Sequence, residues 1–385
     1  MALRIGIIAG EPSGDLLAAG LMNALREQLP DVRFEGIAGP LMRASGIDQW
    51  APMDSLSVMG LFEVLRHLPG LLRLRSRVLR RWRDTPPAVF IGVDAPDFNL
   101  TVESRLRAAG VPTVHYVSPT VWAWRTGRVR KIRRAVDLLL TMFPFETEFL
   151  GRYQVPARYV GHPLAAKMPL EPDRSGARAR LGLDTRAPVL ALLPGSRRGE
   201  VSRLARPFLD TALALRAALP DLKVVVPLIS DVTEQLFEQA RRETPGELEL
   251  QVVREGTDLA LAAADVVLTA SGTATLEGLL SKRPMVVGYK VSGATYAVGR
   301  LFRLLKARHV AMANLLADER LAPELIQHAC EPARLLPPLL AFFRDADLRE
   351  RIARRYTAIH RELRTDTNRE AARAVVDLLE ARGLA

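Results

Sequence analysis

Short apolar runs rich in β-branched residues alternate with longer helical patterns along most of this chain. The first run, 3–9, is followed by a helical pattern over 15–29, and further runs lie at 88–93, 113–117, 138–142 and 158–160. A second series of runs lies at 189–193, 223–227, 249–253, 266–269 and 285–288. This alternation is typical of βαβ units, whose parallel strands are covered on both faces by helices. The sequence therefore predicts an α/β fold with two doubly wound sheets that face a cleft.

The domain boundaries follow from the break between these two series. Residues 163–175 are rich in proline and charge, which is typical of a linker. We expect a first Rossmann-like domain at 1–165 and a second at 176–338. Residues 339–385 are helical in pattern, with apolar residues at intermittent 3.6-residue spacing. These helices either cross back to the first domain or pack on a partner.

The chain is strongly basic, with a formal net charge of +11 from 54 Lys and Arg against 43 Asp and Glu. Such an excess favours anionic partners, which include nucleic acid, phosphorylated ligands and acidic lipid. Two stretches, 59–83 and 122–134, interleave basic with apolar residues as interfacial helices do. The alternative for each is a core-facing helix with a solvated basic face. No recognised nucleic-acid motif accompanies them, so nucleic acid is not an expected partner.

Cysteine, histidine and hydropathy patterns limit the other classes. The single cysteine, Cys330, excludes an internal disulfide framework and suits a reducing compartment. No apolar run approaches the roughly 18 residues of a membrane span, and the N-terminal run is too short for a signal peptide. We therefore expect a cytoplasmic protein whose membrane contact is peripheral. The six histidines lack the spacing of a zinc site, so no metal and no other cofactor is predicted.

In the first predicted domain, two loops that follow strands carry polar groups. In loop 10–15, Ser13 and Gly14 stand before a helix whose N-terminus suits a polar sugar or an anion. The alternative is that Ser13 or Asp15 simply caps this helix. In loop 92–99, Asp94 and Asp97 are spaced to orient a hydroxyl group and to deprotonate it. The alternative for Asp97 is capping of a helix that begins at Phe98.

In the second predicted domain, two further loops have the composition of a nucleotide site. Gly195, Ser196 and Arg197 combine backbone donors, a hydroxyl and a guanidinium, which suit a pyrophosphate. The small residues 271–273 let a phosphate approach a helix N-terminus, and Glu277 is placed to accept both hydroxyls of a ribose. Neither loop has the pattern of an ATP-binding P-loop, and the chain lacks the G-x-G-x-x-G fingerprint of a dinucleotide site.

Six segments in this order resemble the bacterial lipid-A-disaccharide synthase family. They are Ala9–Asp15, Gly92–Asn99, His115–Trp124, Leu192–Arg197, Ser271–Glu277 and Pro284–Tyr289. The resemblance implies an inverting, metal-independent GT-B glycosyltransferase of lipopolysaccharide biosynthesis in Gram-negative bacteria. It implies transfer of 2,3-diacylglucosamine from its UDP derivative to 2,3-diacylglucosamine 1-phosphate, with a β-1,6-linked disaccharide and UDP as products. It also implies a peripheral position on the inner face of the cytoplasmic membrane, because both substrates carry acyl chains.

The resemblance also assigns roles to the loop residues. Asp97 is similar to the general base for the acceptor 6-hydroxyl, and Ser13 to a residue beside the reacting sugar. We expect Gly14, Asp94 and Asn99, in the same two loops, to bind substrate. Arg197 resembles the diphosphate ligand, and the UDP site then comprises Gly195, Ser196, Arg197, Ser271, Gly272, Thr273 and Glu277. Asn314 aligns with an asparagine at the cleft, although residues 311–313 are Ala-Met-Ala where the family has Ser-Leu-Pro.

Two other hypotheses stand beside this one. A UDP-sugar epimerase shares the two-domain architecture and the nucleotide site but needs no surface for acyl chains. A non-enzymatic, basic RNA-binding or membrane-scaffolding protein would use the charged surface alone. The sequence leaves the oligomeric state open, a homodimer included.

Overall fold

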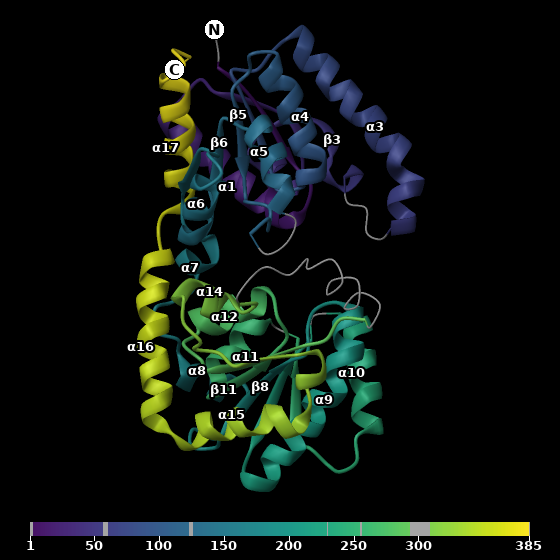
Figure 1. Ribbon diagram of the computed structural model, residues 1–385, viewed down its shortest axis with the longest axis vertical. Helices are drawn as coiled ribbons and strands as arrows, with labels where there is room; N and C mark the ends of the chain where they lie inside the picture. Colours follow the sequence, from purple (N-terminus) through teal and green to yellow (C-terminus); the bar gives the residue numbers. More distant parts are fainter. Residues whose placement is uncertain are drawn as a thin grey trace. The chain divides into compact units, whose positions relative to one another are not determined.

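The computed structural model describes residues 3–56, 61–122, 126–228, 230–254, 256–292 and 309–384. The chain divides into two compact units (Figure 1): unit 1 is Met1–Ala166 with Arg364–Ala385, and unit 2 is Lys167–Leu363. Each unit is built on one parallel sheet between layers of helices. The predicted α/β class with two doubly wound sheets is confirmed.

Unit 1 contains a seven-stranded sheet in the order β3-β2-β1-β4-β5-β6-β7. Its strands are β1 (Arg4–Ala9), β2 (Arg33–Ala38), β3 (Asp48–Pro52), β4 (Val89–Val93), β5 (Thr113–Tyr116), β6 (Leu138–Thr141) and β7 (Ala157–Tyr159). Its helices include α1 (Pro12–Gln28), α2 (Pro40–Ala44), α3 (Leu61–Asp84), α4 (Pro96–Ala108), α5 (Val129–Ala135), α6 (Pro144–Gly151) and α17 (Thr367–Glu380), and the 3-10 turns are η1 (Met53–Ser55) and η2 (Thr126–Arg128). Helix α7 (Pro163–Lys167) leads into unit 2.

The strands β2 and β3 were not expected from the sequence. β3 lies at the edge of the sheet, where its residues are exposed or half-buried, so it carries no apolar run. β2 has Arg33 and Glu35 among its apolar residues, and Gly36 lets it lie close to β1. Edge and near-edge strands therefore lack the continuous hydrophobic run that marks a buried parallel strand.

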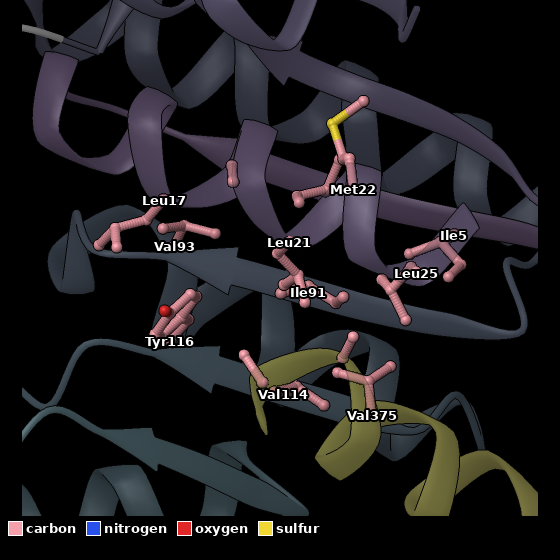
Figure 2. Packing of buried hydrophobic residues seen from close by; sticks show 14 of the residues in the cluster. Ile5, Leu17, Leu21, Met22, Leu25, Ile91, Val93, Val114, Tyr116 and Val375 are labelled. Carbon is pink, nitrogen blue, oxygen red and sulfur yellow. The ribbon is translucent and has the colours of Figure 1, made fainter. Parts of the chain in front are cut away.

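The core of unit 1 joins α1, the central strands and the last helix of the chain. Leu17, Leu21 and Leu25 of α1 point toward β1 and β4, and Val375 of α17 lies against the same sheet (Figure 2). Helix α17 packs beside α1 (Figure 1). An ion pair between Arg158 and Asp377 also ties α17 to the end of β7.

Unit 2 contains a six-stranded parallel sheet in the order β10-β9-β8-β11-β12-β13. Its strands are β8 (Val189–Leu193), β9 (Lys223–Pro227), β10 (Leu250–Val253), β11 (Val266–Thr269), β12 (Met285–Tyr289) and β13 (Glu324–Ile326). Its helices include α8 (Arg174–Arg180), α9 (Arg198–Ala218), α10 (Asp231–Glu243), α11 (Thr257–Ala263), α12 (Thr273–Leu280), α14 (Met312–Ala317), α15 (Pro332–Arg344) and α16 (Ala346–Leu363), with the 3-10 turn η3 (Gln327–Ala329).

Residues 339–385, which the sequence set apart, are divided between the two units. Helix α15 begins at Pro332 and packs on α9 and β12, so it belongs to unit 2 together with α16. Helix α17 belongs to unit 1, because its buried stripe of Ala371, Ala372, Val375 and Leu379 joins the core there. The tail thus includes a helix of the first unit, one of the two outcomes that the sequence left open.

Candidate functional site

A pocket in unit 2 gathers all seven residues predicted to bind UDP. Strands β8 and β11 are neighbours in the sheet, and both end beneath this pocket, whose volume is about 310 Å³. The lining residues are Leu193, Gly195, Ser196, Arg197, Glu200, Pro227, Thr257, Ala270, Ser271, Gly272, Thr273, Ala274 and Glu277. The carboxyl ends of parallel strands are where ligands bind in such sheets.

Glu200 holds the turn after β8 and was missed by the sequence reasoning. Its Oε2 accepts hydrogen bonds from the backbone N–H of Ser196, at 3.2 Å, and of Arg197, at 3.4 Å. Gly195 has a φ of +115°, and a Cβ there would lie 2.5 Å from the Glu200 carboxylate. The Arg197 side chain is 83% exposed and its Nη1 lies 3.6 Å from Glu200. The turn therefore exposes the Arg197 guanidinium to solvent. Its two backbone amides are already hydrogen-bonded to the Glu200 carboxylate.

The turn after β11 is shaped by Gly272, whose φ is +133°. Helix α12 begins at the next residue, and the Ser271 hydroxyl donates to the carbonyl of Val310 at 3.1 Å. Burial, and after it the charge of Asp258, raises the pKa of Glu277. Glu277 lines the pocket, where its carboxyl group can accept hydrogen bonds from hydroxyl donors.

Asn314 lies in the interior of unit 2. Its Nδ2 donates to the carbonyl of Ala322 at 2.7 Å and to Glu324 Oε1 at 2.9 Å, and its Oδ1 accepts from the N–H of Ala322 at 2.8 Å. The side chain is fully buried. These bonds tie α14 to the start of β13, and contact of Asn314 with substrate stays a prediction.

In unit 1, the turn after β4 has a strained backbone. Asp94 and Ala95 have φ values of +52° and +43°, and Val117, after the adjacent strand β5, has +80°. Non-glycine residues in the left-handed region cost of order 1–3 kcal/mol each and cluster at functional sites. The buried Asn99 stabilises the turn, since its Nδ2 donates to the Asp94 carbonyl at 2.8 Å. Asn99 is thus a buried residue that stabilises the turn through a hydrogen bond to its backbone.

Asp97 is exposed and paired, and it does not cap α4. The helix begins at Pro96, and its N-cap residue, Ala95, has no capping side chain, so the capping alternative is wrong. The Asp97 side chain is 80% exposed, and its Oδ1 accepts a hydrogen bond of 2.8 Å from Arg128 Nη2. Arg128 belongs to η2 and is itself 33% exposed. A carboxylate open to solvent beside a strained turn is available to a ligand.

A buried acid–imidazole pair lies beneath this turn. His115 Nδ1 of β5 and Glu103 Oε1 of α4 are 2.6 Å apart, and both side chains are 0% exposed. Burial raises the pKa of Glu103, against the lowering effect of His115. Gly92 of β4 leaves room for the pair, because a Cβ there would lie 2.2 Å from Glu103 Oε1. The sequence reasoning missed the pair, although Glu103 follows Asn99 by one helical turn.

Asp15, which follows β1, does not cap its own helix as the capping alternative held. The buried carboxylate of Asp15 accepts hydrogen bonds from the N–H groups of Gly39, Leu41 and Met42 at 3.0, 2.9 and 3.1 Å. Asp15 therefore caps α2 rather than its own helix, and the N-cap of α1 has no side-chain bond. Ser13 is exposed, while the buried Gly14 lies close to the end of β4.

An aromatic cluster lies at the carboxyl ends of β6 and β7. Trp122, Phe143, Phe145 and His162 pack with ring centroids 5.1 to 5.8 Å apart. Burial raises the pKa of the neighbouring Glu146 to about 8, and burial lowers the pKa of His162 to about 4. At neutral pH both groups are therefore mainly uncharged.

The two basic stretches differ in what they cover. The side chains of 57–67 and 123–126 lie outside the described residues. In α3, Leu68 and Leu72 are each 41% exposed, whereas Val78 and Trp82 are buried. In α5 the apolar residues face the core and the basic ones face solvent, as in the core-facing alternative. Within the described ranges, no helix is long and apolar enough to cross a membrane.

Comparisons with known proteins agree with the six-segment resemblance. A family model described as lipid-A-disaccharide synthetase matches residues 5–376. The lipid-A-disaccharide synthase of Pseudomonas aeruginosa (strain LESB58) is 51% identical over 380 residues, which cover 99% of this chain and 99% of the relative. That of Serratia proteamaculans (strain 568) is 46% identical over 379 residues, which cover 98% and 99%.

Solved structures share the fold at low identity. A putative UDP-N-acetylglucosamine 2-epimerase from Listeria monocytogenes has a TM-score of 0.62 at 10% identity, with 100% of this chain and 97% of that chain covered. The calicheamicin glycosyltransferase has a TM-score of 0.59 at 16% identity, with both chains fully covered. These likenesses show the GT-B type of fold.

Proposed function

The chain belongs to the lipid-A-disaccharide synthase family, and we propose that the pocket of unit 2 binds the UDP-sugar donor while the turn after β4 binds the acceptor. The protein is a hexosyltransferase that moves 2,3-diacylglucosamine from UDP to 2,3-diacylglucosamine 1-phosphate. The observation that carries this conclusion is the family match over residues 5–376. The alternatives of an epimerase and a non-enzymatic scaffold have no comparable support.

For the donor, each of the two turns that line the pocket binds a different part of UDP. Arg197 of the turn after β8, whose side chain is exposed, suits the diphosphate, because charge-assisted hydrogen bonds to phosphate are strong. Gly272 and Thr273 let the nucleotide approach the start of α12. Glu277 accepts the ribose hydroxyls. The leaving diphosphate is stabilised by Arg197 and the N-terminus of α12, without a metal ion.

For the acceptor, Asp97 serves as general base. The 6-hydroxyl must lose a proton as its oxygen attacks the anomeric carbon of the donor, and the bond from that carbon to UDP breaks on the opposite face. This displacement inverts the configuration and yields the β-1,6 linkage. The proton goes to Asp97, whose exposed carboxylate the strained turn presents. Ser13 and Asp94 line the surface around it, while Gly14 and Asn99 are buried beneath the two loops.

For the membrane, the first half of α3 is the proposed contact. Leu68 and Leu72 are exposed, and Arg73, Arg77 and Arg80 on the same helix are exposed as well. Apolar residues flanked by arginines suit the boundary of an anionic lipid surface. These features support the proposal that the protein lies peripherally on the inner face of the cytoplasmic membrane.

One assay tests the function: the protein is incubated with both acylated sugars, and UDP and disaccharide are measured together. Equal amounts of the two products are expected, and UDP release without disaccharide would refute the synthase. Asp97→Asn should lower turnover by about 10²- to 10⁴-fold, the usual contribution of a general base, with UDP binding intact. Arg197→Ala should instead weaken UDP binding by about 10- to 100-fold, the contribution of a hydrogen bond to a charged group.

A further inference from the structure

The ion pair between Arg128 and Asp97 leaves most of the guanidinium unused. Arg128 bonds Asp97 through Nη2, and a guanidinium offers five N–H donors in a planar fork. Among the residues that the structure describes, no other acceptor for Arg128 is recorded. With 33% of its side chain exposed, Arg128 has donors open to a ligand that reaches Asp97.

The acceptor brings a negative charge to this place. It carries a phosphate monoester on C1, and the hydroxyl that Asp97 would deprotonate is on C6 of the same ring. Only C5 and the ring oxygen separate C1 from the exocyclic C6. A ligand whose 6-hydroxyl meets Asp97 therefore carries its phosphate within reach of a guanidinium that already touches this carboxylate. Arginine is well suited to a phosphate, because its fork binds two oxygens at once.

We propose that Arg128 binds the 1-phosphate of the acceptor and in doing so releases Asp97 Oδ1 for the acceptor hydroxyl. In the unliganded protein the guanidinium pairs with Asp97 Oδ1, one of the two carboxylate oxygens. A phosphate dianion competes for the same fork with a higher charge, so the arginine moves from the carboxylate to the phosphate. The phosphorylated acceptor thus prepares its own base, which makes the phosphate a condition for transfer. This inference rests on the proposed function.

The neighbouring Arg130 provides a matched control. It is exposed, it lies two residues further along the chain, and it has no recorded bond to Asp97. Replacing it removes the same charge from the same stretch of the surface. An effect of the overall positive potential would appear in both variants, whereas a specific phosphate contact would appear only at Arg128.

The test compares two acceptors, 2,3-diacylglucosamine with and without the 1-phosphate, in wild type, Arg128→Ala, Arg128→Lys and Arg130→Ala. The rate of disaccharide formation and the Kd of each acceptor without donor are measured. With the phosphorylated acceptor, Arg128→Ala should lose about 10- to 100-fold in kcat/KM. With the dephosphorylated acceptor, wild type should form little disaccharide, and Arg128→Ala should form more than wild type, because its Asp97 Oδ1 is no longer paired with the guanidinium. Arg128→Lys should recover part of the loss, and Arg130→Ala should change little.

Each outcome decides the question. An equal loss with both acceptors would show that Arg128 acts only by holding Asp97, and would overturn the proposal. An equal loss in Arg130→Ala would reduce it to a general effect of charge and would overturn it too. A wild type that forms no disaccharide from the phosphorylated acceptor would instead refute the proposed function itself. An active wild type whose Arg128 variants keep full rates would refute this inference alone.

Discussion

Glu103→Met should lower turnover through the strained turn that carries Asp94 and Asp97. Glu103 and His115 form a fully buried pair at 2.6 Å. On the same face of α4, Asn99 holds the carbonyl of Asp94, and Gly92 packs closely against both Asn99 and Glu103. Methionine matches glutamate in length but accepts no strong hydrogen bond. The substitution therefore leaves the His115 Nδ1 side of the pair without its partner.

The expected magnitude follows from this burial. A buried polar group that loses its hydrogen-bond partner costs about 1–3 kcal/mol, and the broken half of a buried ion pair about 3–5 kcal/mol. We expect unfolding free energy to fall by about 3 kcal/mol, between these two ranges. Because the left-handed residues of the turn need support from their surroundings, kcat should fall at least about tenfold. The proposed UDP pocket lies in unit 2, so the affinity for UDP should not change.

The assay measures disaccharide formation, UDP affinity and chemical unfolding in three variants. Glu103→Gln keeps an acceptor for His115 and should retain most of the kcat. Thr113→Val is the matched control, since Thr113 is equally buried at the amino end of the same strand β5 and donates to the carbonyl of Ala135 at 2.8 Å. It should lower stability and leave kcat unchanged. If Glu103→Met reduces kcat no more than Thr113→Val does, the pair does not support the turn.

Three further predictions concern stability and the membrane. The pKa of Glu146 is about 8 when folded, against an ordinary value of 4.5, so between these values the folded state keeps a proton that the unfolded state has lost. The free energy of unfolding should therefore fall as pH rises through this window, by about 1.4 kcal/mol per pH unit. Glu146→Gln should remove this decline, and denaturation curves at several pH values check it. Arg178→Met should destabilise unit 2 by about 3–5 kcal/mol. Arg178 is buried, and its guanidinium donates hydrogen bonds to Asp265 and to the carbonyls of Ala263, Asp184, Thr185 and Ala187. An unchanged unfolding midpoint would contradict this prediction. Leu68→Glu with Leu72→Glu should reduce sedimentation with anionic vesicles without lowering the melting temperature; undiminished binding would exclude this part of α3 as the contact.

The sequence determined the two parallel sheets and the residues that meet in the pocket of unit 2. Buried parallel strands read as continuous apolar runs, and their carboxyl ends meet at one edge of the sheet. For this reason Gly195 and Gly272, far apart in the chain, could be placed in one pocket from local patterns alone. The family resemblance added roles for individual residues, which no periodicity can supply.

Only the tertiary structure decided which side chains meet across long stretches of chain. The pairs Arg128 with Asp97 and His115 with Glu103, and the bonds of Asn314 inside unit 2, depend on how helices pack on strands. Helix α17 belongs to unit 1 because its buried stripe fits beside α1, a match that its own amphipathic pattern does not specify. Local patterns are set by neighbours in the sequence, whereas these contacts are set by close packing of the whole unit.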